Sequence, residues 1–510
     1  MPNGNVSYWE RNCGPRPEFE PLSGDVACEV AVVGGGLTGI TLSALLARQG
    51  VNTIVLEADR IGSGTTGKTT GKITVQHGLK YHRLIDGVGA ENARLYAEAN
   101  RMGADQIAGF VDAMDSGCDY TRAPSVVYAG DDEQVKELEK EMRAMERLHM
   151  GAALTEGCGL PFPVNAALTM ENQAHFHPLK YLFGLAKMLA ESRTCALHEH
   201  SKVTVLEHGR RCLLRMNGGA VRADTVVLAT NYPLVEMPGF YFTRLHRQRS
   251  YIRCVDAPGL DIGGVYINGA KPVHSFRTHS ANKTTRLLAC GYGHKTGHQG
   301  DRDSYQDLRA LVDNSFGQDM TLVAQWSAQD TVTLDDVPYV GTLSKETPNV
   351  YIATGYDKWG MTNATAAALM IADRITSANR SIRGCAAAFD PHRFTPGASA
   401  KSFLVQNFDV IRQFTAGNLS IPFDDLKTLQ NGEGRIMGVD SDAVAAYRDG
   451  DGTAHVFNAH CTHLRCPLTY NPMERSFDCP CHGSRFGTDG KVLEGPAIFP
   501  LDKKDAGEKD

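Results

Sequence analysis

Two short apolar runs lie near the start of the chain, at 29–33 and 52–56, with a helical pattern between them. Each run has the length of a buried strand, and the segment from Thr38 to about Gln49 has the spacing of a helix that ends at Gly50. A strand, a helix and a second strand in this order form a βαβ unit, so we expect a parallel sheet here.

Further along, apolar residues recur at helical spacing in 91–114 and 132–148, between charged residues. This pattern is typical of amphipathic helices that pack on a core. Residues 240–330 alternate instead between apolar and polar positions, which favours an antiparallel sheet. A last apolar strand, at 350–354, precedes a helix that runs to about Ile375. The pattern therefore predicts an α/β part combined with an antiparallel sheet.

The C-terminal quarter of the chain has a different pattern. Residues 385–402 hold prolines, glycine and small side chains, and we expect a linker there. Residues 403–414 have a helical pattern and are expected to dock the two halves, so that linker and docking helix together span 385–418. From about 419 onwards only short strands are indicated. We therefore expect a small, separate all-β domain over 419–510.

Composition and charge exclude some classes of function. The 510 residues are 42% hydrophobic and 22% charged, and the net charge of −6 gives no reason to expect nucleic acid as a partner. Membrane-spanning helices need about 20 apolar residues in a row, and no such run is present. The first residues lack the basic stretch and apolar core of a signal peptide. The expected location is the cytoplasm.

The first βαβ unit carries a glycine motif in the context that gives the motif meaning. Gly34, Gly36 and Gly39 follow the first strand and open the helix, and Glu57 ends the second strand. This arrangement is the fingerprint of a dinucleotide site. Gly34 allows the turn, Gly36 lets the backbone approach a pyrophosphate, and Gly39 lets helix and strand pack closely. The helix N-terminus favours the phosphates, and Glu57 can bind the ribose hydroxyls.

A loop rich in Gly, Thr and Lys follows Glu57, at 58–72, and offers N–H groups, hydroxyls and ammonium groups to a phosphate chain. Together with the strand at 225–231, the D-x-x-P-x-x-G motif at 335–341 and the Gly-aromatic turn at 355–362, it resembles the D-amino-acid-oxidase-like FAD oxidoreductases. That family includes sarcosine and glycine oxidases. The resemblance implies FAD as cofactor, with contacts from Arg60, Thr65, Thr66, Lys68, Thr69, Val203, Gly355, Trp359, Gly360, Met361 and Thr362.

The same resemblance implies a division of residues 1–400 into two interleaved parts. The FAD-binding part is Rossmann-like, of the glutathione-reductase type, and an antiparallel sheet forms the substrate domain over the flavin. The expected bounds are 28–90, 195–235 and 335–380 for the FAD-binding part, and 91–194 and 236–334 for the substrate domain.

Cysteine and histidine crowd the C-terminal domain. Of 13 cysteines, nine are scattered singly and four lie between Cys461 and Cys481, next to His463 and His482. The pattern C-x-H, fifteen residues, C-x-x-H resembles the ligand motif of Rieske [2Fe–2S] proteins. The resemblance implies that Cys461 and Cys479 bind one iron, and His463 and His482 the other. A zinc site is the alternative, but structural zinc sites usually pair two cysteines with two histidines in separate motifs.

The Rieske resemblance implies further roles in the same two loops. Cys466 and Cys481 match the cysteines that form a loop-to-loop disulfide in high-potential members, and we expect this bond here. Ser484 matches a hydroxyl that donates to a bridging sulfide, and 495–497 match the proline loop that covers the cluster. Arg465 replaces a usual glycine. Phe486 replaces a tyrosine that bonds to a ligand sulfur, which leads to the hypothesis of a lower potential than in respiratory relatives.

The two resemblances together predict an FAD-dependent dehydrogenase. A small amine or amino-acid-like substrate would give a hydride to FAD, and single electrons would pass to the fused cluster. Alternatives are a 2-hydroxy-acid or polyol-phosphate dehydrogenase, and a non-enzymatic electron carrier or redox sensor. A separate electron-transfer protein or a quinone is a possible partner. Arg249, as a ligand of a substrate carboxylate, and His294, as a base, are the candidates for catalysis.

Overall fold

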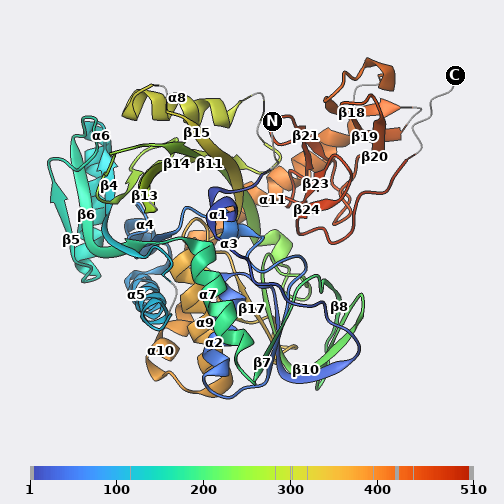
Figure 1. The fold of residues 1–510 in the computed structure, drawn as a ribbon, viewed down its shortest axis with the longest axis horizontal. Helices are drawn as coiled ribbons and strands as arrows, with labels where there is room; N and C mark the ends of the chain where they lie inside the picture. Colours follow the sequence, from blue (N-terminus) through green and yellow to red (C-terminus); the bar gives the residue numbers. More distant parts are fainter. Residues whose placement is uncertain are drawn as a thin grey trace.

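A computed structural model describes residues 5–114, 117–281, 283–298, 300, 302–318, 320–393, 395–419, 424–439 and 442–504. Figure 1 shows two large sheets with their helices and, apart from them, a smaller β domain formed by the C-terminal residues. Helix α11 lies between the large part and this small domain.

The first sheet is mostly parallel and has the order β16-β17-β10-β1-β2-β7, with β9 and β8 added antiparallel beside β10. The predicted βαβ unit is confirmed, because β1 pairs with β2 in parallel across α2. Helix α9 packs against both α2 and α5 in the core beside this sheet (Figure 1). The strands are β1 Val26–Val33, β2 Thr53–Leu56, β7 Cys195–His198, β8 Val203–Glu207, β9 Cys212–Met216, β10 Gly219–Asn231, β16 Tyr339–Thr342 and β17 Val350–Thr354.

The second sheet is mixed but mainly antiparallel, with the order β15-β11-β14-β13-β12-β4-β6-β3, and it confirms the antiparallel prediction for 240–330. One parallel pair, β12 with β4, joins its two halves. Its short last strand, β3, lies inside the stretch predicted for the FAD-binding part. The strands are β3 Lys72–Ile73, β4 Thr121–Ala129, β5 Ala152–Thr155, β6 Ala166–His175, β11 Leu245–Asp256, β12 Val265–Asn268, β13 His274–Ala281, β14 Thr284–Lys295 and β15 Leu322–Thr333.

The helices include those predicted at 91–114 and 132–148, which are observed as α5 and α6. His177 caps α7, where its side chain accepts a hydrogen bond from the Lys180 backbone N–H. The helices are α1 Tyr8–Asn12, α2 Leu37–Ala47, α3 Thr65–Lys68, α4 Tyr81–Val88, α5 Ala90–Asp112, α6 Asp132–Arg147, α7 Pro178–Ala190, α8 Ser304–Phe316, α9 Gly360–Thr376, α10 Arg380–Phe389 and α11 Pro396–Leu419, with short 3₁₀ turns η1 Tyr241–Thr243 and η2 Leu426–Thr428.

The linker expected at 385–402 is wrong as a description of the backbone. Helix α10 continues to Phe389, and α11 begins at Pro396, so most of this stretch is helical. Cys385 and Phe389 are buried in the main core. The physical reason is that small residues such as alanine favour helices when one face can be buried.

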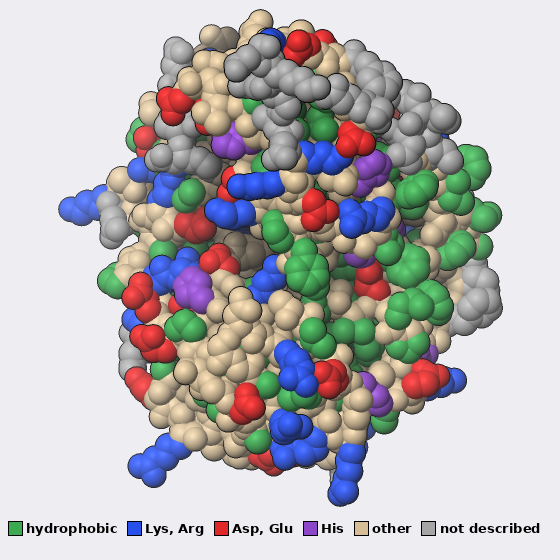
Figure 2. Space-filling model, turned by 90° about the vertical axis from the view of Figure 1, so that its right-hand side faces the viewer, with side chains coloured by type: hydrophobic (Ala, Val, Ile, Leu, Met, Phe, Trp, Pro, Cys, Tyr) green, Lys and Arg blue, Asp and Glu red, His purple; other side chains and the backbone are tan. Residues whose placement is uncertain are grey.

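The C-terminal domain is all-β, as predicted. It contains one sheet of order β18-β19-β20 and another of order β21-β22-β23-β24. Figure 2 views the molecule from this side and shows charged side chains of both signs, with apolar side chains gathered along one part of the face. Among the described residues, no helix is long and apolar enough to span a membrane. The strands are β18 Gly434–Val439, β19 Asp442–Arg448, β20 Ala454–Asn458, β21 Thr469–Asn471, β22 Ser476–Asp478, β23 Arg485–Gly487 and β24 Val492–Glu494.

Candidate active site and cluster site

The glycine motif forms a tight turn between β1 and α2. Gly34 has φ +111°, and a Cβ there would lie 2.6 Å from the Ala229 carbonyl oxygen. A Cβ on Gly39 would lie 2.0 Å from the Gly34 carbonyl oxygen, because the helix packs closely against the turn. Gly36 caps α2 without a side-chain hydrogen bond, and Leu37 and Thr38 of the first turn line the cavity with it. The turn therefore fits a pyrophosphate.

Glu57 is held in place by backbone N–H groups. Its Oε2 accepts a hydrogen bond of 2.7 Å from Gly35, and its Oε1 one of 2.9 Å from Asp59. Burial raises the pKa of this carboxyl, although those N–H groups counteract the effect. Glu57 lines the same cavity as the glycine turn. An acid at this position can accept hydrogen bonds from ribose hydroxyls.

The Gly/Thr/Lys loop contains α3, and most of the predicted contacts lie at the cavity. Thr66 accepts a hydrogen bond of 3.1 Å from the Leu37 N–H at the start of α2. Arg60 lies elsewhere: among the described residues it is not part of the cavity wall, and its guanidinium pairs with Glu18 at 2.9 Å. A role for Arg60 at the cofactor therefore has no support in this geometry. The cavity is lined by Thr65, Thr66, Lys68, Thr69 and Val203.

The motif at 355–362 places the start of α9 against the cavity, which Trp359, Gly360 and Met361 line. The Trp359 ring stacks on His77, with 4.6 Å between ring centroids. Burial lowers the pKa of His77 well below its usual value, so this imidazole is neutral. His77 could not be found from the sequence, because it belongs to no motif that indicates a functional residue.

Two further predicted contacts of this motif have structural roles. Gly355 has φ +81°, and a Cβ there would meet the Thr333 side chain at 2.3 Å. The buried Thr362 hydroxyl donates to the Thr74 carbonyl oxygen. Among the described residues, neither belongs to the cavity wall. Both therefore shape the turn and helix around the site.

The cavity has a volume of about 1220 Å³ and lies between the mostly parallel sheet and the antiparallel sheet. The glycine turn and Glu57 line it, and the antiparallel sheet contributes Ser250, His274 and Asp330. Residues 492–498 of the C-terminal domain also line it. A single cavity thus joins a dinucleotide site to the loop that was predicted to cover an iron–sulfur cluster.

The predicted iron ligands converge on two facing loops. Cys461 and Cys479 are fully buried, and the rings of His463 and His482 lie with centroids 5.2 Å apart. The Nδ1 atoms of both histidines are buried and, within the described part of the chain, have no hydrogen-bond partner. Two thiols with two unpartnered imidazole nitrogens fit the Cys₂His₂ ligand set of a [2Fe–2S] cluster. Burial lowers the pKa of His482 to about 4, so the imidazole is in its metal-binding form.

Two residues near the predicted iron ligands that the resemblance singled out, Ser484 and Arg465, have different environments. Ser484 is buried, and its Oγ accepts a hydrogen bond of 2.9 Å from the Ala497 N–H in the proline loop. Arg465 has φ +58°, a conformation that favours glycine. The Arg465 side chain lies at the surface beside Asp502. Arginine in place of glycine therefore makes the backbone conformation of this turn less favourable, while its side chain stays outside the buried site.

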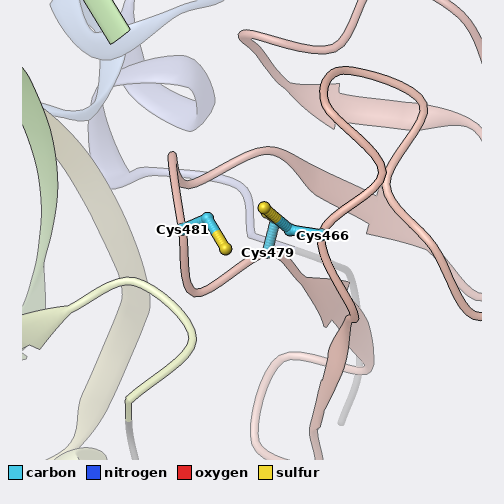
Figure 3. Close-up of side chains that lie close together, drawn as sticks. All are labelled: Cys466, Cys479 and Cys481. Carbon is cyan, nitrogen blue, oxygen red and sulfur yellow. The ribbon is translucent and has the colours of Figure 1, made fainter. Parts of the chain in front are cut away.

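Cys466 and Cys481 are thiols in this structure, as are the other described cysteines. Their sulfur atoms and that of Cys479 lie within 4.8 Å of one another (Figure 3). The predicted disulfide is therefore not formed here, but the two loops already hold its sulfurs close together.

We expect a Cys466–Cys481 bond to form in the oxidised holoprotein, because bound iron would withdraw Cys479 from the group and leave this pair as neighbours. Unfolding under acid, alkylation and peptide mass spectrometry would then find Cys466 and Cys481 unlabelled unless a reductant is added first. Cys385, a buried single cysteine, serves as the control that is labelled in both samples. Equal labelling of all three would contradict the expectation.

Arg249 does not have the place predicted for it. Its side chain is fully buried and pairs with two carboxylates of the C-terminal domain, Glu474 and, at 2.9 Å, Glu494. Among the described residues it does not line the cavity. Its guanidinium is therefore committed to the domain interface, and the suggestion that it binds a substrate carboxylate is wrong. The sequence could not reveal this, because the partners lie more than 200 residues away.

His294 does line the cavity, but both of its ring nitrogens have partners. Nε2 lies 2.8 Å from the Tyr251 hydroxyl, and Nδ1 lies 2.8 Å from the Lys295 carbonyl oxygen. Burial lowers its pKa, so the ring is neutral. These contacts hold His294 in a fixed orientation at the wall, and a role as a base stays a prediction.

Gln329 connects the Gly/Thr/Lys loop to the loop that carries Cys479 and His482, and the sequence did not single it out. Its backbone oxygen accepts a hydrogen bond of 3.2 Å from the Thr65 hydroxyl. Its side-chain amide donates at 2.8 Å to the carbonyl oxygen of Gly483, the residue after the predicted ligand His482. One residue of β15 thereby joins the wall of the cavity at the dinucleotide motif to a loop that carries two of the predicted iron ligands.

Comparison with known proteins identifies both halves. The family model of the FAD dependent oxidoreductases (DAO) matches residues 29–374, and that of the Rieske [2Fe-2S] domain matches residues 421–503. The chain belongs to the DAO family of FAD-dependent oxidoreductases and carries a Rieske [2Fe–2S] domain. Its cofactors are FAD and a [2Fe–2S] cluster, as the motifs predicted.

One relative shares the whole arrangement. YhfW of Bacillus subtilis (strain 168), named as a Rieske 2Fe-2S iron-sulfur protein, is 32% identical over 501 residues, which cover 98% of this chain and 97% of YhfW. Gamma-glutamylputrescine oxidoreductase of Escherichia coli (strain K12) is 28% identical over 45% of this chain and 55% of its own length. The solved glycine oxidase of Geobacillus kaustophilus has the same fold as the flavin part, with TM-score 0.61 and 17% identity over 72% of this chain and 99% of its own.

Proposed function

We propose that the protein dehydrogenates a small amine or amino-acid-like compound and passes the electrons to its own cluster. FAD accepts a hydride when such a substrate is oxidised, and a [2Fe–2S] cluster takes up electrons one at a time. The observation that carries the proposal is the shared cavity, which is lined both by the dinucleotide motif and by residues 492–498 of the Rieske domain. The link through Gln329 supports it, because it joins both cofactor sites by hydrogen bonds.

The charged groups of the cavity support a substrate with a carboxylate and an amine. Lys72 and Lys358 line the cavity, and Lys358 donates a hydrogen bond of 2.5 Å to Ser250. Asp330 lines it too, and burial raises its pKa to about 6, against the opposing effect of Lys358. Ammonium groups bind a carboxylate, and a carboxyl group with this pKa can accept a proton from an amine near neutral pH.

An anaerobic substrate screen tests the proposal. The holoprotein is mixed with glycine, sarcosine, L-proline or gamma-glutamylputrescine, and separately with lactate or glycerol 3-phosphate. We expect an amine to bleach the flavin absorbance and the EPR signal of the reduced cluster to follow. Bleaching by the hydroxy compounds alone would replace the proposal by the 2-hydroxy-acid or polyol-phosphate alternative. Bleaching by none would favour an electron carrier or redox sensor.

The ammonium of Lys72 gives this proposal a pH dependence. Burial lowers the pKa of Lys72 to about 7, so the group loses its charge as the pH rises through that value. The KM of a carboxylate substrate is therefore expected to rise above pH 7. In Lys72→Met the KM at pH 6 should be about tenfold higher, as is typical for the loss of a charged hydrogen bond, and should no longer depend on this ionisation.

Steady-state kinetics between pH 6 and 9 on a substrate found in the screen measures this effect. Lys140→Met is the control, because Lys140 is an exposed residue of α6 that pairs with Glu137. An unchanged KM in Lys72→Met would show that the substrate carboxylate binds elsewhere.

A separate electron-transfer protein or a quinone would then reoxidise the cluster. The surface of α11 supports a protein acceptor, since Leu404, Val405 and Phe408 are exposed there at 67%, 57% and 72%. Exposed apolar surface of this kind is typical of contact sites.

A further inference from the structure

Glu236 belongs to the flavin part of the chain and reaches the cluster ligand His463. It lies between β10 and β11, and its Oε2 accepts a hydrogen bond from His463 Nε2. The two side chains are only 14% and 10% exposed, so water screens the contact weakly. Among the described residues the buried Nδ1 atom of His463 has no hydrogen-bond partner, so it is the nitrogen left for iron, and the Nε2 atom carries the proton that it donates to Glu236.

The other oxygen of the same carboxylate is also held. The Tyr232 hydroxyl donates to Glu236 Oε1 at 2.6 Å, and Tyr232 is 5% exposed and lines the FAD cavity. The segment continues to Phe242, whose ring packs edge-on against His482 with 6.1 Å between ring centroids. One segment of the flavin part thus contacts both histidine ligands and places a fixed carboxylate at one of them.

A carboxylate in this position affects the electronic properties of the cluster. It makes the imidazole of His463 a more electron-donating ligand, as second-shell carboxylates do in metal sites. Its negative charge also opposes the electron that the cluster gains on reduction. Both effects stabilise the oxidised cluster and therefore lower its reduction potential.

We propose that Glu236 is a positioning residue that fixes the His463 ring and lowers the reduction potential of the cluster from the flavin side of the interface. The potential of the cluster is therefore set by the docked arrangement of both domains, in addition to the residues of the Rieske domain. This inference concerns the cluster alone, so it stands or falls independently of the substrate.

A redox titration of the full-length holoprotein tests the proposal, with EPR of the reduced cluster as the readout. Glu236→Gln keeps the shape and an acceptor oxygen but removes the charge. At a fixed ambient potential, the ratio of reduced to oxidised cluster is expected to rise about tenfold, which for one electron is an upward shift of about 59 mV. Iron content and the visible spectrum of the oxidised cluster should stay as in the wild type.

Two more variants separate this role from a purely structural one. Tyr232→Phe removes the hydrogen bond that shares the carboxylate's charge, so the bond to His463 should strengthen and the potential should fall. Asp409→Asn removes a carboxylate charge from another contact of the interface, that of α11 with Lys295 and His298, and should shift the potential clearly less than Glu236→Gln, because its partners are Lys295 and His298 and not a histidine of the cluster site.

An unchanged potential in Glu236→Gln, or an equal shift in Asp409→Asn, would overturn the proposal. If Glu236→Gln fails to bind a cluster, the Tyr232→Phe variant decides: a fall in potential supports the proposal, and a rise or no change contradicts it.

Discussion

Replacing Arg249 by methionine is expected to lower the free energy of unfolding by about 3–5 kcal/mol, the cost typical of breaking a buried ion pair on one side. Arg249 is fully buried between Glu474 and Glu494, and Arg485 contacts the same two carboxylates. The Met variant keeps most of the side-chain volume but leaves Glu474 and Glu494 with one cation fewer.

Chemical denaturation of the holoprotein measures this effect, with flavin and cluster absorbance read separately. The two signals are expected to be lost at different denaturant concentrations in the variant, because the ion network holds the Rieske domain on the flavin part. Arg94→Met is the matched control: Arg94 pairs with Glu91 and Glu98 on the exposed side of α5 and should change nothing measurable. Wild-type stability in Arg249→Met would contradict the account of the interface.

Gly39→Ala is expected to weaken FAD binding about tenfold to hundredfold while leaving the cluster in place. The added Cβ would lie 2.0 Å from the Gly34 carbonyl oxygen, and a backbone atom cannot move aside as a flexible side chain can. Overpacking of this kind costs about 1–3 kcal/mol, and here the movement falls on the turn that is predicted to bind the pyrophosphate.

The ratio of flavin to protein after gel filtration measures the loss, and the EPR signal of the chemically reduced cluster confirms that the Rieske domain is intact. Gly109→Ala provides the control, because Gly109 lies within α5 and a Cβ there would have no atom within 4 Å. Full flavin content in Gly39→Ala would mean that the turn can relax without loss of the phosphate site.

The parts of the site that are local in sequence could be predicted, and those built across the fold could not. The glycine turn with Glu57 is a continuous strand–helix–strand unit, and each cluster loop carries its own cysteine and histidine. By contrast, Glu236 and His463 are 227 residues apart, and neither has a neighbour that suggests the other. The role of Arg249 was misjudged for the same reason, since an arginine suits a substrate carboxylate and an interface carboxylate equally.

The linker predicted between the two domains was wrong for a different reason. Prolines and small residues suggested a linker, but Cys385 and Phe389 are buried, and α10 packs against α5 and α9. Tertiary packing makes α10 helical, because one face of this helix is covered by the core. The next helix, α11, reaches Lys295 of the flavin part, and Asp409 of α11 forms an ion pair with it near the cluster site.

Transfer of electrons from the flavin to the fused cluster can be tested by flash photoreduction, without a known substrate. FAD in the anaerobic holoprotein is reduced by light in the presence of a sacrificial tertiary amine, and flavin absorbance and the EPR signal of the cluster are followed together. The account predicts that the signal of the reduced cluster appears as the flavin is reduced, and that Arg249→Met slows its appearance. A fully bleached flavin beside a cluster that stays oxidised, yet is reduced by dithionite, would contradict it.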